Sequence, residues 1–120
     1  MTVDPLSQVS VEREILRISG LLDHQVGEVA KRARAAAEAE VAYKLGMARA
    51  TLVAGGKTVA ERDAEALLEC EDAYAAHKGA DAVLLAAQEA GRSLRAQIDA
   101  LRTLAANQRA AITHSEGVGR

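Results

Sequence analysis

Aromatic residues and cysteine are almost missing from this chain of 120 residues, and long apolar runs are missing altogether. It has no Trp, no Phe and only two tyrosines, whereas the face of a β-sheet is normally filled with aromatic and β-branched residues. A single cysteine, Cys70, excludes an internal disulfide and a multi-cysteine zinc site, and we expect a buried, unreactive thiol. Neither a signal peptide nor a run of roughly 18 apolar residues is found. We therefore expect a soluble, intracellular protein.

Alanine is the residue that the chain has in excess, with 27 copies. Alanine is the best helix former, so the sequence predicts an all-α protein. Although apolar residues make up 49% of the chain, a core of methyl groups buries little area per residue. We therefore expect long helices that pack side by side and rely on assembly into a homo-oligomer.

The sequence predicts a single domain over residues 1–120. Capping residues divide its first half into two helices. Ser10 is the predicted cap of a short helix that Gly20 ends, so residues 1–22 form a leader and a short helix. Asp23 is the predicted cap of a second helix over residues 23–54.

A glycine-containing turn at residues 55–58 is expected to follow the second helix. Gly55 and Gly56 tolerate positive φ and so end that helix. Thr58 and Glu61 form a capping box, in which the threonine oxygen accepts from the Glu61 amide and the glutamate reaches back.

The second half of the chain is predicted to form one long helix over residues 59–113, with a kink near Gly79 and a flexible tail over 114–120. Together with the second helix it makes a long antiparallel hairpin that assembles through coiled-coil-like packing. A heptad seam runs along its later part: Leu84, Ala87, Gly91, Leu94, Ile98, Leu101, Ala105, Gln108 and Ile112.

Charge alternates along the chain although the net charge is only −2. Residues 31–57 hold six basic and two acidic residues, residues 61–72 hold one basic and six acidic residues, and residues 91–120 hold five basic and two acidic residues. Basic blocks therefore flank an acidic one.

Three arginines, Arg95, Arg102 and Arg109, recur at heptad spacing beside the seam. The complementary flanking positions are not acidic, which leaves two destinations for this arginine stripe. Either the acidic block of a neighbouring subunit neutralises it, or a polyanion such as a phosphate backbone occupies it. The first basic block adds Lys31, Arg34, Lys44, Arg49 and Lys57 as candidate phosphate contacts.

Motifs for catalysis, cofactors or metals are weak. Gly55-Gly56-Lys57-Thr58 has the end of a phosphate-binding loop, but Thr51 stands where that loop needs its first glycine, and a helix rather than a strand leads in. His24 with Glu28, and His77 with Asp81, offer two ligands each, fewer than zinc requires. We expect no enzyme, no cofactor and no metal site.

Several short motifs between residues 38 and 110 resemble the UvsY-type recombination mediators of tailed phages. They are Ala42-Tyr43-Lys44, Met47-Ala48-Arg49, Lys57-Thr58-Val59 with Asp63 behind it, Ser93-Leu94-Arg95 and Leu104. In that family, helical subunits assemble into a ring-like homo-oligomer that binds single-stranded DNA. The oligomer helps to load a RecA-like recombinase onto strands covered by single-strand-binding protein. A Lys-Ala-Arg-Leu motif is implicated in DNA contact there, and Arg49 is the basic residue of that motif present here.

Two functions therefore stand as hypotheses. One is a phage recombination mediator acting in the cytoplasm of a bacterial host, with single-stranded DNA, a RecA-like recombinase and single-strand-binding protein as partners. The other is a non-enzymatic structural or scaffold helical assembly protein of a phage, whose charged blocks only pair subunits.

Overall fold

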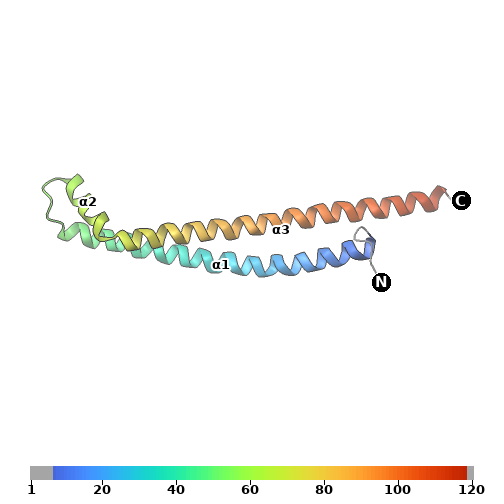
Figure 1. Ribbon diagram of the computed structural model, residues 1–120, viewed down its shortest axis with the longest axis horizontal. Coiled ribbons are helices and arrows are strands. Elements are labelled where there is room, and N and C mark those ends of the chain that lie inside the picture. The colour runs from blue at the N-terminus through green and yellow to red at the C-terminus, as the bar shows by residue number, and fades with distance from the viewer. Residues whose placement is uncertain (1–6, 119–120) are drawn as a thin grey trace. The chain divides into compact units, whose positions relative to one another are not determined.

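The computed structural model describes residues 7–118, and nearly all of them are helical (Figure 1). Helix α1 spans Gln8–Val53, α2 spans Val59–Glu69 and α3 spans Glu71–Val118. No strand occurs between residues 7 and 118, so the all-α prediction is confirmed. The predicted leader before Ser7 and the last two residues of the predicted tail lie outside the described residues.

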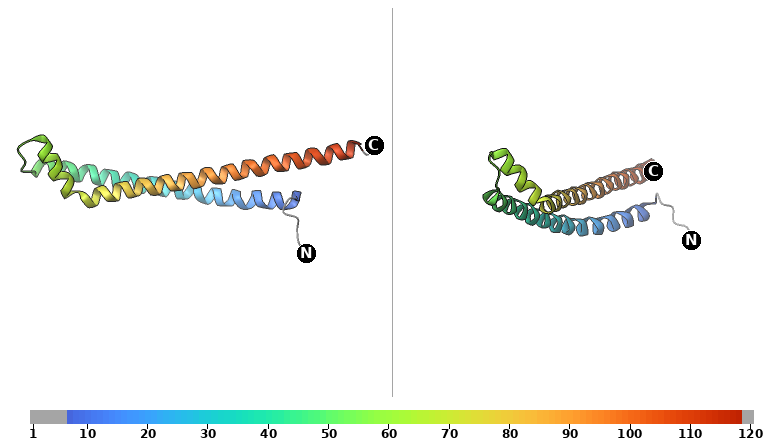
Figure 2. Two further views of the ribbon diagram at one scale, coloured as in Figure 1. Left: turned by 45° about the horizontal axis from the view of Figure 1, so that its top comes forward. Right: turned by 60° about the vertical axis from the view of Figure 1, so that its left-hand side comes forward.

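The contacts within the chain form two compact units rather than one. The first, which we call the terminal unit, contains Ser7, residues 8–27 of α1 and residues 89–118 of α3. The second, which we call the turn unit, contains residues 28–88, with the rest of α1, all of α2 and the beginning of α3. Both divisions fall inside continuous helices, where no linker marks a boundary (Figures 1 and 2).

Helix α1 is continuous where the sequence analysis placed a break, so the prediction of a separate short helix ending at Gly20 is wrong. Inward-facing residues recur at spacings of four and three on both sides of Gly20, as Val11, Ile15, Ile18 and Leu22 do. This packing outweighs the roughly 1 kcal/mol by which a glycine disfavours a helix interior.

The start of α1 also differs from the prediction. Ser10 lies inside the helix, and Ser7 is the residue whose Oγ accepts a hydrogen bond from the Ser10 amide at 3.1 Å. Asp23 lies in the middle of α1 and caps nothing. Several serines and aspartates in this region could cap a helix. The true cap is the one that lies one turn before the first inward-facing apolar residue, Val11.

The predicted helix over residues 59–113 is divided at Cys70, and no break falls at Gly79, where a kink was predicted. Cys70 leaves helical geometry, with φ −99° and ψ 21°, while its amide still donates to the Ala66 oxygen at 3.0 Å. The thiol is buried, and its Sγ lies 3.4 Å from the position that a Cβ would occupy if Gly46 carried a side chain. We attribute the break to this close packing, together with the acidic residues that suit the first turn of α3. Gly79 lies in the interior of α3, which runs on to Val118 rather than ending at 113.

The capping box before α2 is confirmed in the turn unit. Thr58 is extended, and its Oγ1 accepts from the Glu61 amide at 3.1 Å. Glu61 reaches back to the Lys57 amide at 2.8 Å, one residue earlier than the usual pattern. Gly55 and Gly56 do not adopt positive φ, so the predicted reason for their presence is wrong. Close approach explains Gly56 instead, because a Cβ there would lie 2.7 Å from that of Glu61.

The core of the terminal unit is the heptad seam of α3 packed against the same chain's α1. Ile98 is 4% exposed, and Val11, Ile18 and Ala105 are buried with it. Gly91 is buried as well, and a Cβ added to it would lie 3.7 Å from the Cγ of Gln25. This part of the seam is covered within one chain, so it does not by itself require a second subunit. Ile112, 47% exposed, is the exception.

The core of the turn unit is small. Ala36, Ala66 and Cys70 are its buried residues. Tyr43 of α1 adds a stacked contact with His77 and a tilted contact with Tyr74, with ring centroids 5.6 and 5.5 Å apart. Small side chains bring the helices close together in this unit but bury little apolar area.

Candidate nucleic-acid interface

The arginine stripe of α3 lies on the surface of the terminal unit. Arg95, Arg102 and Arg109 are all exposed, and each follows a half-buried residue of the seam. Between residues 7 and 118, no hydrogen bond or ion pair to any of the three is present. A guanidinium without a carboxylate partner keeps its five donors available for phosphate oxygens.

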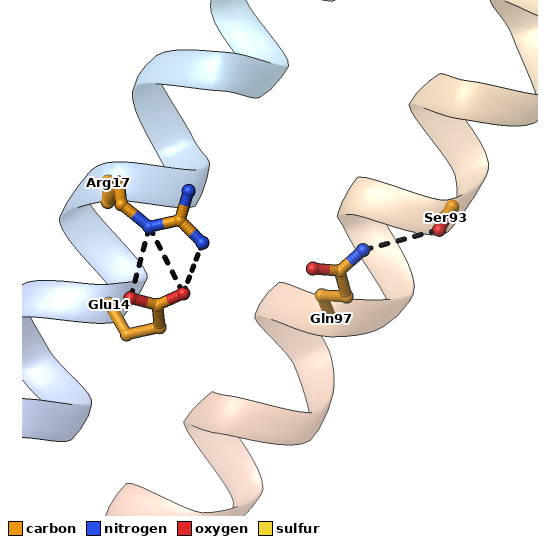
Figure 3. A network of polar contacts seen from close by, with 4 residues as sticks. All are labelled: Glu14, Arg17, Ser93 and Gln97. Atoms are coloured by element: carbon orange, nitrogen blue, oxygen red, sulfur yellow. Dashed lines mark hydrogen bonds and ion pairs between the residues drawn. The ribbon is translucent and has the colours of Figure 1, made fainter. Parts of the chain in front are cut away.

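Two other arginines of the terminal unit, Arg17 and Arg92, are paired, whereas Arg13 on α1 is exposed and unpaired like the stripe. Arg17 binds Glu14 one turn before it on α1, with two N–H···O contacts of 3.1 Å from Nε (Figure 3). This pairing lowers the pKa of the Glu14 carboxyl below its ordinary value. Arg92, on the same helix as the stripe, binds Glu89. Arg92 and Arg17 therefore serve as matched controls for the unpaired arginines.

An open groove of about 400 Å³ lies beside two members of the stripe. Its lining consists of Ser19, Leu22, Asp23, Arg95, Ile98, Asp99 and Arg102. The lining includes two arginines and two aspartates, so its formal charge is zero. An anion is therefore attracted only where it lies closer to the guanidinium groups than to the carboxylates. Arg109 lies outside this groove.

The cations predicted from the first basic block lie in the turn unit, and two of them have partners. Lys44 Nζ is 2.9 Å from a Glu40 oxygen, and this contact lowers the pKa of Glu40 and raises that of Lys44. Lys31 Nζ is 3.7 Å from a Glu28 oxygen. Binding of a phosphate to either lysine must compete with a carboxylate, which reduces the expected gain.

Arg34, Arg49 and Lys57 are exposed, and none has an ion pair or a side-chain hydrogen bond among the described residues. Arg34 lines a shallow groove of about 290 Å³ with Lys31 and Ala30. The eight predicted residues thus fall into two sets, three in the terminal unit and five in the turn unit. Arg95 with Arg102, and Lys31 with Arg34, are the pairs brought to a common groove.

Sequence reasoning missed the exposed apolar residues of the turn unit. Val41, Leu45 and Leu52 recur at helical spacing, which predicts a packed stripe, yet all three are exposed, Leu52 at 86%. Tyr43, Gly46 and Ala50 are among the residues on the inward side instead. Their spacing continues the heptad of Val11 and Ile18, and that phase is the signal that could have identified the inward face.

His77 is a largely enclosed histidine of the turn unit. Its Nδ1 is buried and has no hydrogen-bond partner, and the nearest carboxylate oxygen, on Asp81, is 3.7 Å away. No group of three potential metal ligands gathers anywhere in residues 7–118. Within the same residues, no helix has the length and apolarity needed to cross a membrane.

Comparison with known proteins gives no relative. No family model matches the chain, and neither the curated proteins nor the solved structures searched include a match.

Proposed function

We propose that this protein is a non-enzymatic, homo-oligomeric protein that binds single-stranded DNA and acts as a recombination mediator. The observation that carries the proposal is the set of unpaired arginines on α3, Arg95, Arg102 and Arg109, beside an α3 arginine that is paired. Repetition every seven residues on one helix face suits contact with a repeating phosphate backbone. The role in loading a RecA-like recombinase rests on the resemblance to the UvsY-type mediators.

Binding without much base stacking is the expected mode. Tyr43 and Tyr74 contact each other in the turn unit, where Tyr74 is exposed, and the terminal unit has no aromatic residue among residues 7–27 and 89–118. Single-strand-binding proteins usually add aromatic stacking to a basic groove. Contacts with the phosphates would therefore dominate, and the affinity would be salt-sensitive and insensitive to base sequence.

Salt dependence of binding tests this proposal. Fluorescence anisotropy with a labelled oligo-dT strand of about 30 nucleotides, from about 50 to 200 mM salt, gives the slope of log affinity against log salt. Replacing Arg95, Arg102 and Arg109 with Ala should weaken binding and reduce the slope by about 2 for each subunit bound, since each single-strand phosphate contact contributes about 0.7.

The control is the double variant Arg17→Ala, Arg92→Ala, which removes two paired arginines of the same unit and should leave the slope unchanged. An unchanged slope in the triple variant would contradict the proposal. Absence of binding by the wild type at 50 mM salt would contradict it too, and would favour a structural assembly protein whose charged blocks only pair subunits.

A further inference from the structure

Helix α1 presents an exposed face in the turn unit that is both apolar and basic. Leu45, Arg49 and Leu52 are spaced by four and three residues, so they lie on one side of the helix. All three are exposed, and Arg49 has no ion pair among the described residues. Exposed leucines beside an unpaired arginine are an unusual surface for a lone subunit. We call this the basic leucine face.

Helix α2 presents a face of the opposite charge in the same unit. Glu65, Leu68 and Glu69 line an open groove of about 480 Å³, and Leu68 is 75% exposed. The Glu69 carboxylate forms no ion pair or hydrogen bond with any residue between 7 and 118, whereas the Glu65 carboxylate accepts from the Gly55 amide at 3.0 Å. The rest of the groove is apolar, lined by Ala50, Val53 and Ala54. We call this the acidic groove.

We infer that the basic leucine face of one copy packs into the acidic groove of a second copy. The leucines of α1 would cover Leu68 and the apolar lining, while Arg49 of one copy would reach Glu69 of the other. This inference rests on the homo-oligomer part of the proposed function. Because the two surfaces differ and belong to one unit, the contact can be made twice about a two-fold axis or repeated around a ring.

Charge complementarity favours a second copy over an unrelated partner. The two surfaces carry opposite charge and both expose apolar side chains, and Arg49 and Glu69 have no ion pair within the described part of the chain. The assignment also changes the expected role of Arg49. Resemblance to the UvsY-type mediators implies a DNA contact for Arg49, whereas this contact makes it a subunit residue and leaves DNA to the stripe on α3.

Reversing the two charges tests the contact in the full chain. Arg49→Glu and Glu69→Arg should each weaken self-association about tenfold or more in sedimentation equilibrium. The double variant carrying both substitutions should recover most of the wild-type association, because the attraction is restored with its sign reversed. Glu69 is suited to this test since it has no partner within the chain and an arginine near the end of α2 is favourable for the helix. Circular dichroism checks that helix content is kept.

The matched control is Leu85→Ser, which removes an exposed leucine of the same unit outside both surfaces and should not change association. Unchanged association in the two single variants would overturn the inference, and so would a double variant no better than the singles. The latter result would point to a basic segment of another protein as the occupant of the groove.

DNA binding separates this contact from the proposed function. The double variant should bind oligo-dT with the wild-type salt slope. A slope reduced by about 0.7 per bound subunit would show that Arg49 contacts a phosphate of the DNA, and would overturn the inference. If the charge swap restores association while the Arg95, Arg102 and Arg109 variant keeps its slope, the contact stands and the DNA-binding proposal fails.

Discussion

Individual glycines have different reasons to be present, although their sequence contexts look alike. No described glycine adopts positive φ, so none is required by a left-handed backbone. Gly56 and Gly46 allow close approach to Glu61 and Cys70, whereas Gly20 has no atom within 4 Å of its Cβ position. Space around the residue, rather than backbone conformation, therefore decides which glycines tolerate a side chain.

Gly20→Ala should raise the free energy of unfolding by about 0.5–1 kcal/mol, because alanine is the better residue in an unbroken helix. Gly56→Ala should lower it, since the new Cβ would lie 2.7 Å from the Cβ of Glu61. Urea unfolding followed by circular dichroism, at one protein concentration, measures both. Destabilisation by Gly20→Ala would show that a helix ends at Gly20 after all.

At the scale of the helices, packing depends on which side of each helix faces inward. In α3 the predicted seam is correct from Gly91 to Gln108, and its members are buried or half-buried. In α1 the apolar residues Val41, Leu45 and Leu52 lie on the exposed side instead. Helix α1 has apolar residues on two sides, and only packing against the other helix selects between them.

The two isoleucines of the α3 seam should differ sharply. Ile98→Asp places a charge in the core of the terminal unit and should cost several kcal/mol, roughly as burying an unpaired charge does. Ile112→Asp, at a half-exposed position of the same heptad, should cost no more than about 0.5 kcal/mol. Urea unfolding of the two variants measures the difference. Equal effects would mean that the seam is covered mainly by a second subunit.

The sequence was sufficient for the all-α class, the capping box at Thr58 and the α3 seam, because each follows from local propensity or periodicity. It could not show the break at Cys70, which depends on the contact with Gly46 across the turn unit. Nor could it show that Lys44 is paired and Arg95 is not. Lys44 and Glu40 stand four residues apart, a spacing that permits a pair, but neither spacing nor charge count reveals which side chains meet.

At the scale of the whole molecule, charge is nearly balanced in each unit. Residues 7–27 with 89–118 contain six basic and six acidic residues, a net charge of zero. In the proposed function, phosphate contacts by the terminal unit therefore come from its unpaired arginines, and each subunit makes few of them. Useful affinity then requires several subunits on one strand, where linked contacts raise the effective concentration. The proposal therefore makes assembly and DNA binding parts of one mechanism.

Native mass spectrometry of the full chain, with and without an oligo-dT strand of about 30 nucleotides, tests this central claim most directly. We predict a multimer of the chain alone and the same multimer holding one strand, with strand loss as salt rises. Monomers in both samples, or a multimer that never takes up the strand, would contradict the account.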